Sequence, residues 1–209
     1  MPRNVRVLFV GDSVTAGFGL AGAPTFAELT SERLAERGLD VAVERSALDG
    51  ADSAYLLKRF DRMVTAHDPD WVVFHVGLND ALPPAGRAPR RPAEFAANLL
   101  ELIDRTMTIA ARPVLVTPNP RYASVPQGRF ARAERGDVMP VYVDVVRGLA
   151  EALQLPLIDA HRAFLAEADG DELLQDGTHP TARGHELLAD LLTEELLQLL
   201  DGPRTRVQS

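Results

Sequence analysis

A serine, a histidine and an aspartate in this sequence have the types and spacing needed to activate a hydroxyl nucleophile. Ser13 closes the segment GDS (11–13), directly after an apolar, β-branched run. His179 lies in DGTHP (176–180), three residues after Asp176. This spacing lets the Asp176 carboxylate fold back onto one imidazole nitrogen while the other faces a nucleophile, as a general base requires. Ser13 can also offer its own backbone N–H to an oxyanion.

Two further segments carry groups that suit the same chemistry. Asn79, in GLND (77–80), has a side-chain amide that can donate to an oxyanion. Gly50, in ALDGADS (47–53), offers an unobstructed backbone N–H, or simply a turn with positive φ. Each segment alone is also typical of an ordinary turn or helix cap. Together, they indicate a site built from several strand ends.

The other histidines fit the role of base less well. His67 is expected at a solvated helix end, and His75 inside a strand as a packed, hydrogen-bonded residue. His161 and His185 lie in helical contexts. A metal site made of Asp176, His179 and His185 is an alternative, but it has neither a third carboxylate nor an HExxH pattern to support it.

The elements that must position these residues can be predicted from the hydrophobic pattern. Strand-like runs occupy 5–10, 40–46, 71–76, 113–118 and 156–160, and three of them are almost continuously apolar, as in a parallel sheet covered on both faces. Helical patterns occupy 25–38, 92–111, 138–154 and 180–200. The alternation predicts a three-layer α/β/α sandwich with five parallel strands and right-handed crossovers. Ligands bind such sheets at the carboxyl ends of the strands, where all four segments should meet.

Composition narrows the class of protein. The 209 residues include no cysteine, a single lysine (Lys58) and a net charge of -8. Cysteine chemistry is thereby excluded, and a P-loop or a Schiff-base lysine finds no support. The negative charge argues against nucleic-acid binding. No cofactor is expected.

Location and domain organisation can also be predicted. Because no run is long enough to span a bilayer and the apolar run 5–10 is too short for a signal peptide, we expect a cytoplasmic protein. One domain over 1–200 with a disordered tail at 201–209 is expected, and the oligomeric state is not indicated.

The four segments, in this order along nearly the whole chain, resemble the SGNH/GDSL hydrolase family. The resemblance implies a flavodoxin-like fold and hydrolysis of esters through an acyl-enzyme. It implies that Ser13 is the nucleophile, His179 the base and acid, and Asp176 its orienting partner. By the same resemblance the Ser13 and Gly50 N–H groups and the Asn79 side chain form the oxyanion hole. The first segment departs from the family where an acidic residue often follows the threonine, and the second lacks an asparagine often found before its glycines. The general G-x-S-x-G elbow is absent because Thr15 replaces the second glycine.

The substrate is expected to be a small acyl ester. Residues 81–136 include nine arginines and only four acidic residues, which is an excess of positive charge in an acidic chain. This excess fits a solvated surface, but it also suits recognition of an anionic or carrier-bound acyl group. The candidate rim residues are Arg87, Arg90, Arg91, Arg121, Arg129 and Arg132. We also place Asp12 among the substrate-binding residues.

Two other functions remain open at this point. The same acyl-enzyme would catalyse acyl transfer if an alcohol outcompeted water. A non-catalytic flavodoxin-like binding module is the other alternative, although such a module has no need of Ser13, Asn79, Asp176 and His179 together.

Overall fold

The fold is built on a five-stranded parallel sheet. The computed structural model describes residues 4–83, 87–121, 123–124, 130–131, 139–167 and 170–201. The strands are β1 (Val5–Gly11), β2 (Val41–Ala47), β3 (Trp71–His75), β4 (Arg112–Val116) and β7 (Leu157–Ile158), in the order β2-β1-β3-β4-β7. All four pairings are parallel. Every predicted strand is therefore confirmed, and the order is that of flavodoxin-like sheets.

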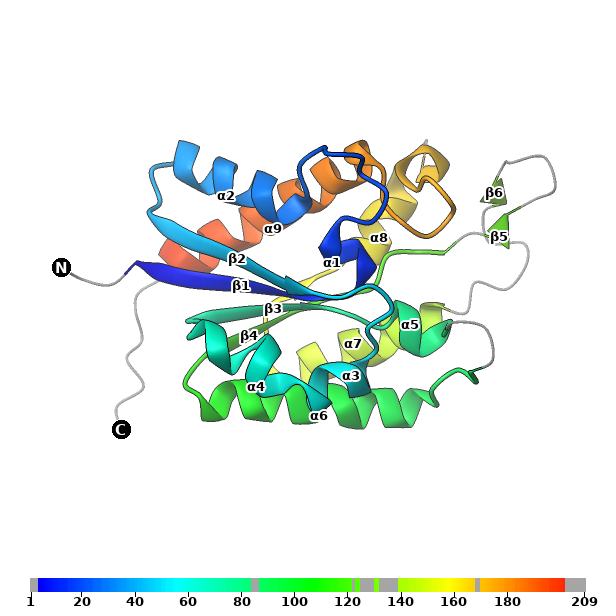
Figure 1. Ribbon diagram of the computed structural model, residues 1–209, viewed down its shortest axis with the longest axis horizontal. Helices are drawn as coiled ribbons and strands as arrows, with labels where there is room; N and C mark the ends of the chain where they lie inside the picture. Colours follow the sequence, from blue (N-terminus) through cyan, green and yellow to red (C-terminus); the bar gives the residue numbers. More distant parts are fainter. Residues whose placement is uncertain are drawn as a thin grey trace.

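Helices cover both faces of the sheet (Figure 1). One face carries α2 (Phe26–Glu36), α8 (Ala160–Ala166) and α9 (Ala182–Asp201), and the other carries α3 (Ser53–Lys58), α4 (Phe60–Met63), α6 (Pro92–Thr108) and α7 (Met139–Leu153). Two short helices, α1 (Ser13–Ala16) and α5 (Leu78–Ala81), follow β1 and β3 directly. The predicted three-layer α/β/α sandwich is confirmed.

The remaining elements are small. They are the 3₁₀ helices η1 (Thr65–His67) and η2 (Gly170–Leu173) and an antiparallel pair of two-residue strands, β5 (Ala123–Ser124) and β6 (Phe130–Ala131). Helix α9 ends at Asp201, and residues 202–209 of the expected tail lie outside the described residues.

Local sequence signals set the helix boundaries. The side chain of Thr25 accepts a hydrogen bond from the Glu28 N–H, and the Glu28 carboxylate accepts one from the Thr25 N–H at 2.7 Å. This capping box starts α2 where the sequence predicts it. Pro92 occupies the first turn of α6, where its missing N–H costs nothing.

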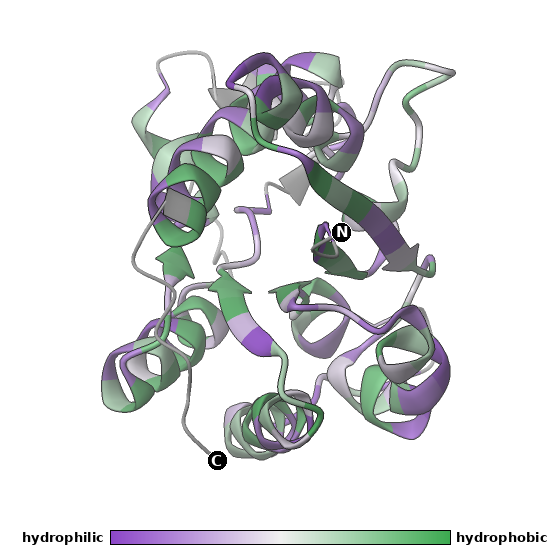
Figure 2. Cartoon of the chain, turned by 90° about the vertical axis from the view of Figure 1, so that its left-hand side faces the viewer, coloured by the Kyte–Doolittle hydropathy of each residue, from purple (hydrophilic) through white to green (hydrophobic). Residues whose placement is uncertain are grey.

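The core lies between the sheet and its two helical layers. Strand β3 is buried along its whole length, and β1 and β4 are buried except near their first residues. In Figure 2 the helices around the sheet carry both hydrophobic and hydrophilic residues. The largest fully buried side chains include Phe9, Phe26, Phe74, Phe95 and Phe164. This packing makes the strand ends rigid supports for polar groups.

Gly11 ends β1 at a point where no side chain fits. A Cβ atom at this position would lie 2.2 Å from Thr15 Oγ1 and 2.5 Å from the His75 carbonyl oxygen. The Gly11 carbonyl also accepts a hydrogen bond from the Leu48 N–H at 3.3 Å. The glycine thus lets β1 turn at once into α1 while staying in register with both neighbouring strands.

We predict that Gly11→Ala lowers the free energy of unfolding by about 1–3 kcal/mol, because the added methyl group overpacks the strand end. Chemical denaturation measures this loss. Gly148→Ala is the matched control: an added Cβ there meets no atom within 4 Å, and alanine in the helix should raise stability by about 0.5–1 kcal/mol. Equal stability of Gly11→Ala and wild type would contradict the steric account.

Candidate active site

The polar segments singled out in the sequence meet at the carboxyl edge of the sheet. Ser13 follows β1, Gly50 lies in the loop after β2, and Asn79 follows β3. Strands β1 and β3 are neighbours, and the chain order reverses between them, which is the switch point where open α/β sheets bind ligands. In Figure 1 this edge carries α1 and α5.

Ser13, His179 and Asp176 form a continuous chain of hydrogen bonds. Ser13 Oγ lies 2.9 Å from His179 Nε2, and His179 Nδ1 lies 2.7 Å from Asp176 Oδ2. Ser13 is buried, and the His179 side chain is 18% exposed. The three side chains have the geometry that the sequence spacing predicts.

The loop that carries His179 is fixed by its own backbone. Asp176 Oδ1 accepts the N–H groups of Thr178 at 2.9 Å and His179 at 2.7 Å. Leu174 and Pro180 pair as an isolated β-bridge across the loop. Asn119, which follows β4, donates its side-chain amide to the Thr178 carbonyl at 2.8 Å. The imidazole is therefore held in place from two separate segments of the chain.

These contacts indicate which imidazole nitrogen of His179 carries a proton. Burial raises the pKa of Asp176, but the hydrogen bonds from the His179 N–H and ring, the His179 charge and the Thr178 N–H outweigh it and hold the pKa below its usual value. An ionised carboxylate only accepts hydrogen bonds, so His179 Nδ1 carries a proton. In the neutral ring Nε2 is then the acceptor, and the Ser13 hydroxyl donates to it.

Asp12 lies beneath the site. It is the N-cap of α1 and is 2% exposed. Its Oδ1 accepts from the Val14 N–H at 3.0 Å, and its Oδ2 accepts from Asn79 Nδ2 at 3.2 Å. Burial raises the pKa of Asp12 to about 7. The expectation that Asp12 binds substrate does not hold, because the carboxylate is enclosed by protein donors.

Three candidate oxyanion donors lie at this edge, and they differ in whether a protein acceptor already binds them. In the described part of the chain, the N–H groups of Ser13 and Gly50 donate to no protein acceptor. Gly50 has a φ of 76°, and an added Cβ there would meet nothing within 4 Å, so its backbone is open to a ligand. Asn79 Nδ2 donates to the Ala51 carbonyl at 3.0 Å as well as to Asp12. The amide of Asn79 thus links the loops that follow β1 and β2.

A second buried carboxylate joins the loops after β2 and β3. Asp80 is 1% exposed and accepts from Ser53 Oγ at 2.6 Å and from the Ser53 N–H at 3.0 Å. Arg90 donates its Nε to Asp80 at 2.8 Å and an NH2 group to Asp52 at 2.9 Å. This network holds the Gly50 segment against the Asn79 segment.

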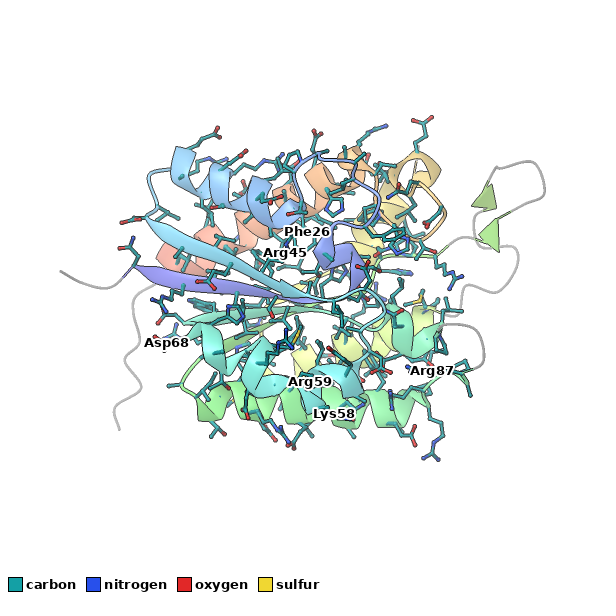
Figure 3. All side chains as sticks on the ribbon, viewed as in Figure 1. Phe26, Arg45, Lys58, Arg59, Asp68 and Arg87 are labelled. Atoms are coloured by element: carbon teal, nitrogen blue, oxygen red, sulfur yellow. The ribbon has the colours of Figure 1, made fainter. Side chains whose placement is uncertain are left out.

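The arginines of the 81–136 region divide into separate groups. Arg90 does not rim a cleft as expected, because its charge is paired internally with Asp52 and Asp80. Arg91 pairs with Glu94 on the surface of α6. Within the described ranges Arg87 and Arg121 form no ion pair, and Figure 3 shows Arg87 at the α5 end of the molecule. Arg129 and Arg132 lie outside the described residues.

The other histidines take up structural positions. His67 ends η1 and contacts Glu44 at 2.7 Å. Burial lowers the pKa values of His75 and His185 to about 4, so both rings are neutral and packed around Phe26. His185 Nδ1 accepts the Phe26 N–H at 3.0 Å and does not join His179. Across the described stretches no three His, Asp or Glu side chains are grouped to hold a metal ion.

Sequence reasoning did not find Phe18. Its ring lies 4.5 Å from the imidazole of His179, centroid to centroid, and 49% of the residue is exposed. The only sequence signal is its position between Gly17 and Gly19, directly after α1. A half-exposed aromatic ring therefore borders the group that would act as base.

Known proteins resemble this chain in sequence and in fold. The sequence profile of the GDSL-like lipase/acylhydrolase family matches residues 9–187. An esterase, TesA, of Pseudomonas aeruginosa is 31% identical over 77% of this chain and 81% of its own length. An arylesterase of Vibrio mimicus is 24% identical over 93% and 90%. The crystal structure of a lipase/acylhydrolase from Enterococcus faecalis superimposes with a TM-score of 0.78 at 33% identity, covering 92% of this chain and 95% of the other.

The chain belongs to the GDSL-like lipase/acylhydrolase family, because the match spans most of its length. It is a carboxylic ester hydrolase of the SGNH/GDSL type. In the portion of the chain that the structure describes, none of the helices combines the length and the apolar character that a membrane crossing requires.

Proposed function

We propose that this protein hydrolyses small carboxylic esters through an acyl-enzyme on Ser13. The observation that carries the proposal is the hydrogen-bonded chain from Ser13 through His179 to Asp176. The names of its relatives, an esterase and an arylesterase, support the same class of substrate. The geometry of the site supports the finer assignment of each residue.

Acylation begins when Ser13 Oγ attacks the ester carbon and its proton moves to His179 Nε2. The carbonyl oxygen becomes an oxyanion, which then collapses and breaks the bond to the alcohol oxygen. His179 gives its proton to that oxygen as the alcohol leaves. Asp176, which stays ionised, stabilises the imidazolium that forms between the two transfers.

Deacylation repeats these steps with water. His179 takes a proton from a water molecule as its oxygen attacks the acyl carbon, and Ser13 Oγ leaves with the proton that His179 returns. Asp176 is 48% exposed and His179 18% exposed, so water has access to the base.

The oxyanion would be stabilised by the N–H groups of Ser13 and Gly50 and by the side chain of Asn79. The two backbone donors have no protein acceptor in the described part of the chain, so an incoming oxygen displaces no internal hydrogen bond. Donors of this type each contribute roughly 10²–10³ in turnover.

We predict that a fluorophosphonate labels wild-type protein on Ser13 and that Ser13→Ala abolishes both labelling and ester hydrolysis. Intact-protein mass spectrometry followed by peptide mapping measures the adduct. Ser46→Ala, on β2 and outside the hydrogen-bonded chain, is the control and should label like wild type. Undiminished hydrolysis by Ser13→Ala would overturn the proposed function.

We further propose that Arg87 and Arg121 draw in an anionic acyl group, such as a free carboxylate or a carrier-bound chain. Both loops touch the site: the Arg90 N–H donates to the Asp80 carbonyl at 2.8 Å, and Asn119 binds the Thr178 carbonyl. Arg87 lies three residues from the first contact and Arg121 two residues from the second. Neither charge is neutralised by an ion pair within the described ranges.

Added salt should therefore reduce kcat/KM for a phenyl hemisuccinate more than for phenyl butyrate, because exposed charges are screened beyond about 3 Å at 1 M salt. Arg87→Gln and Arg121→Gln should lower the preference for the charged ester several-fold. Arg91→Gln, which removes an arginine already paired with Glu94, is the matched control. If the ratio of kcat/KM for the charged ester to kcat/KM for the neutral ester changes with neither salt nor the substitutions, this part of the proposal is wrong.

A further inference from the structure

The ring of Phe18 lies beside the imidazole of His179. Gly17 ends α1 in the left-handed conformation, and the Phe18 N–H donates to the Ser13 carbonyl at 3.0 Å. Gln175 Nε2 donates to the Phe18 carbonyl at 2.9 Å, which ties this segment to the loop that carries His179. The backbone of Phe18 is therefore held at both of its polar groups, one by the nucleophile and one by the histidine loop.

The position of this ring relates it to the alcohol part of the substrate. In the proposed mechanism His179 Nε2 returns a proton to the leaving oxygen, so that oxygen must come within hydrogen-bond reach of Nε2. The centroid of the Phe18 ring lies 4.5 Å from that of the imidazole. Groups attached to the leaving oxygen therefore lie close to Phe18, whereas Gly50 and Asn79 would hold the carbonyl oxygen.

The chemistry of the ring indicates what it would bind. Phe18 is 49% exposed, although removing an apolar side chain from water is favourable. Aromatic rings also favour offset or edge-on contact with other rings. A flat apolar leaving group would cover this surface during the reaction.

We propose that Phe18 forms a leaving-group subsite for aryl and similar flat, apolar alcohols. The inference rests on the proposed roles of Ser13 and His179. A different role for Phe18, shielding the His179–Asp176 hydrogen bond from water, would affect all substrates equally.

The test compares phenyl acetate with hexafluoroisopropyl acetate, which share the acyl group and have leaving groups of similar acidity. Phe18→Ala should lower kcat/KM for the phenyl ester about tenfold and for the alkyl ester less than threefold. Met107→Ala removes another exposed apolar side chain, near the end of helix α6, and should leave the ratio unchanged.

An equal loss on both esters, or no loss on either, would overturn the subsite. If the proposed function itself is wrong, the result differs: Ser13→Ala would hydrolyse both esters as fast as the wild-type protein. In that case the inference falls together with the mechanism on which it rests.

The side-chain amide of Asn79 is held by two acceptors within the protein. Its nitrogen carries two protons, and two protein acceptors face it: Asp12 Oδ2 at 3.2 Å and the Ala51 carbonyl at 3.0 Å. Asp12 is itself held by burial and by the Val14 N–H. The two acceptors fix which end of the amide is the donor end, since an amide oxygen in that place would face two other oxygens.

We infer that Asp12 is a positioning residue that, together with the Ala51 carbonyl, fixes the orientation of the Asn79 amide. Its carboxylate does not touch the reacting atoms in this arrangement, because it accepts from groups within the protein. This inference also rests on the proposed role of Asn79.

A double-mutant cycle tests the coupling. Asp12→Ser keeps a hydroxyl that can cap α1 but is too short to hold Asn79. It should lower kcat at least tenfold in the wild-type background, with KM changed less than threefold. In the Asn79→Ala background the same substitution should lower kcat less than threefold, because the group it acts through is gone. Asp12→Asn serves as a second variant of nearly the same shape.

Two controls separate positioning from folding. Asp159→Ser removes the N-cap carboxylate of α8, away from the site, and should leave kcat unchanged. Thermal unfolding of every variant shows which of them fold. Equal losses from Asp12→Ser in both backgrounds, or no loss in the wild-type background, would overturn the inference. If instead Asn79→Ala alone keeps kcat within threefold of wild type, the oxyanion role of Asn79 fails first.

Discussion

The hydrogen bond between Ser13 Oγ and His179 Nε2 joins residues 166 positions apart, and the rest of the structure serves to make it possible. Each of the two residues therefore needs its own support from the fold. Strand β1, buried between two helical layers, fixes the serine, and a bridged loop pinned by Asn119 fixes the histidine. Gly11 leaves the room that Thr15 and the His75 carbonyl need where β1 turns into α1, which begins with Ser13.

Three carboxylates near this hydrogen bond have different roles because their surroundings differ. Asp176 is half exposed, receives several donors and has a lowered pKa, so it remains an anion beside the imidazole. Burial raises the pKa values of Asp12 and Asp80, and both are enclosed by protein donors that tie loops together. Burial and the number of donors, rather than residue type, separate the carboxylate that supports the base from those that hold the framework.

Much of the fold and site can be predicted from the sequence because the signals are local. Apolar runs identify the five strands, and the capping box at Thr25 locates the start of α2. The spacing of Asp176 and His179 already contains the geometry of their hydrogen bond. The rule that parallel strands gather ligands at their carboxyl ends then brings Ser13 and Asn79 to the same edge.

What the sequence does not reveal are pairings between distant positions. The charge excess in 81–136 is real, but Arg90 is neutralised by Asp52, 38 residues away, and by Asp80. Asp12 looks like a ligand-facing group until its burial under Asn79 is known. Phe18 stands in a glycine-rich turn with no periodicity, and only the folded chain brings its ring to His179. Such contacts arise from tertiary packing, for which no local pattern exists.

The most direct test of the central claim is a crystal structure of the protein carrying a small phosphonate bound covalently to Ser13. The account predicts that the phosphoryl oxygen lies about 2.7–3.1 Å from the Ser13 and Gly50 backbone nitrogens and from Asn79 Nδ2. It also predicts that His179 Nε2 stays within hydrogen-bond distance of the phosphonate ester oxygen. An adduct whose phosphoryl oxygen points into solvent, away from these three nitrogens, would contradict it.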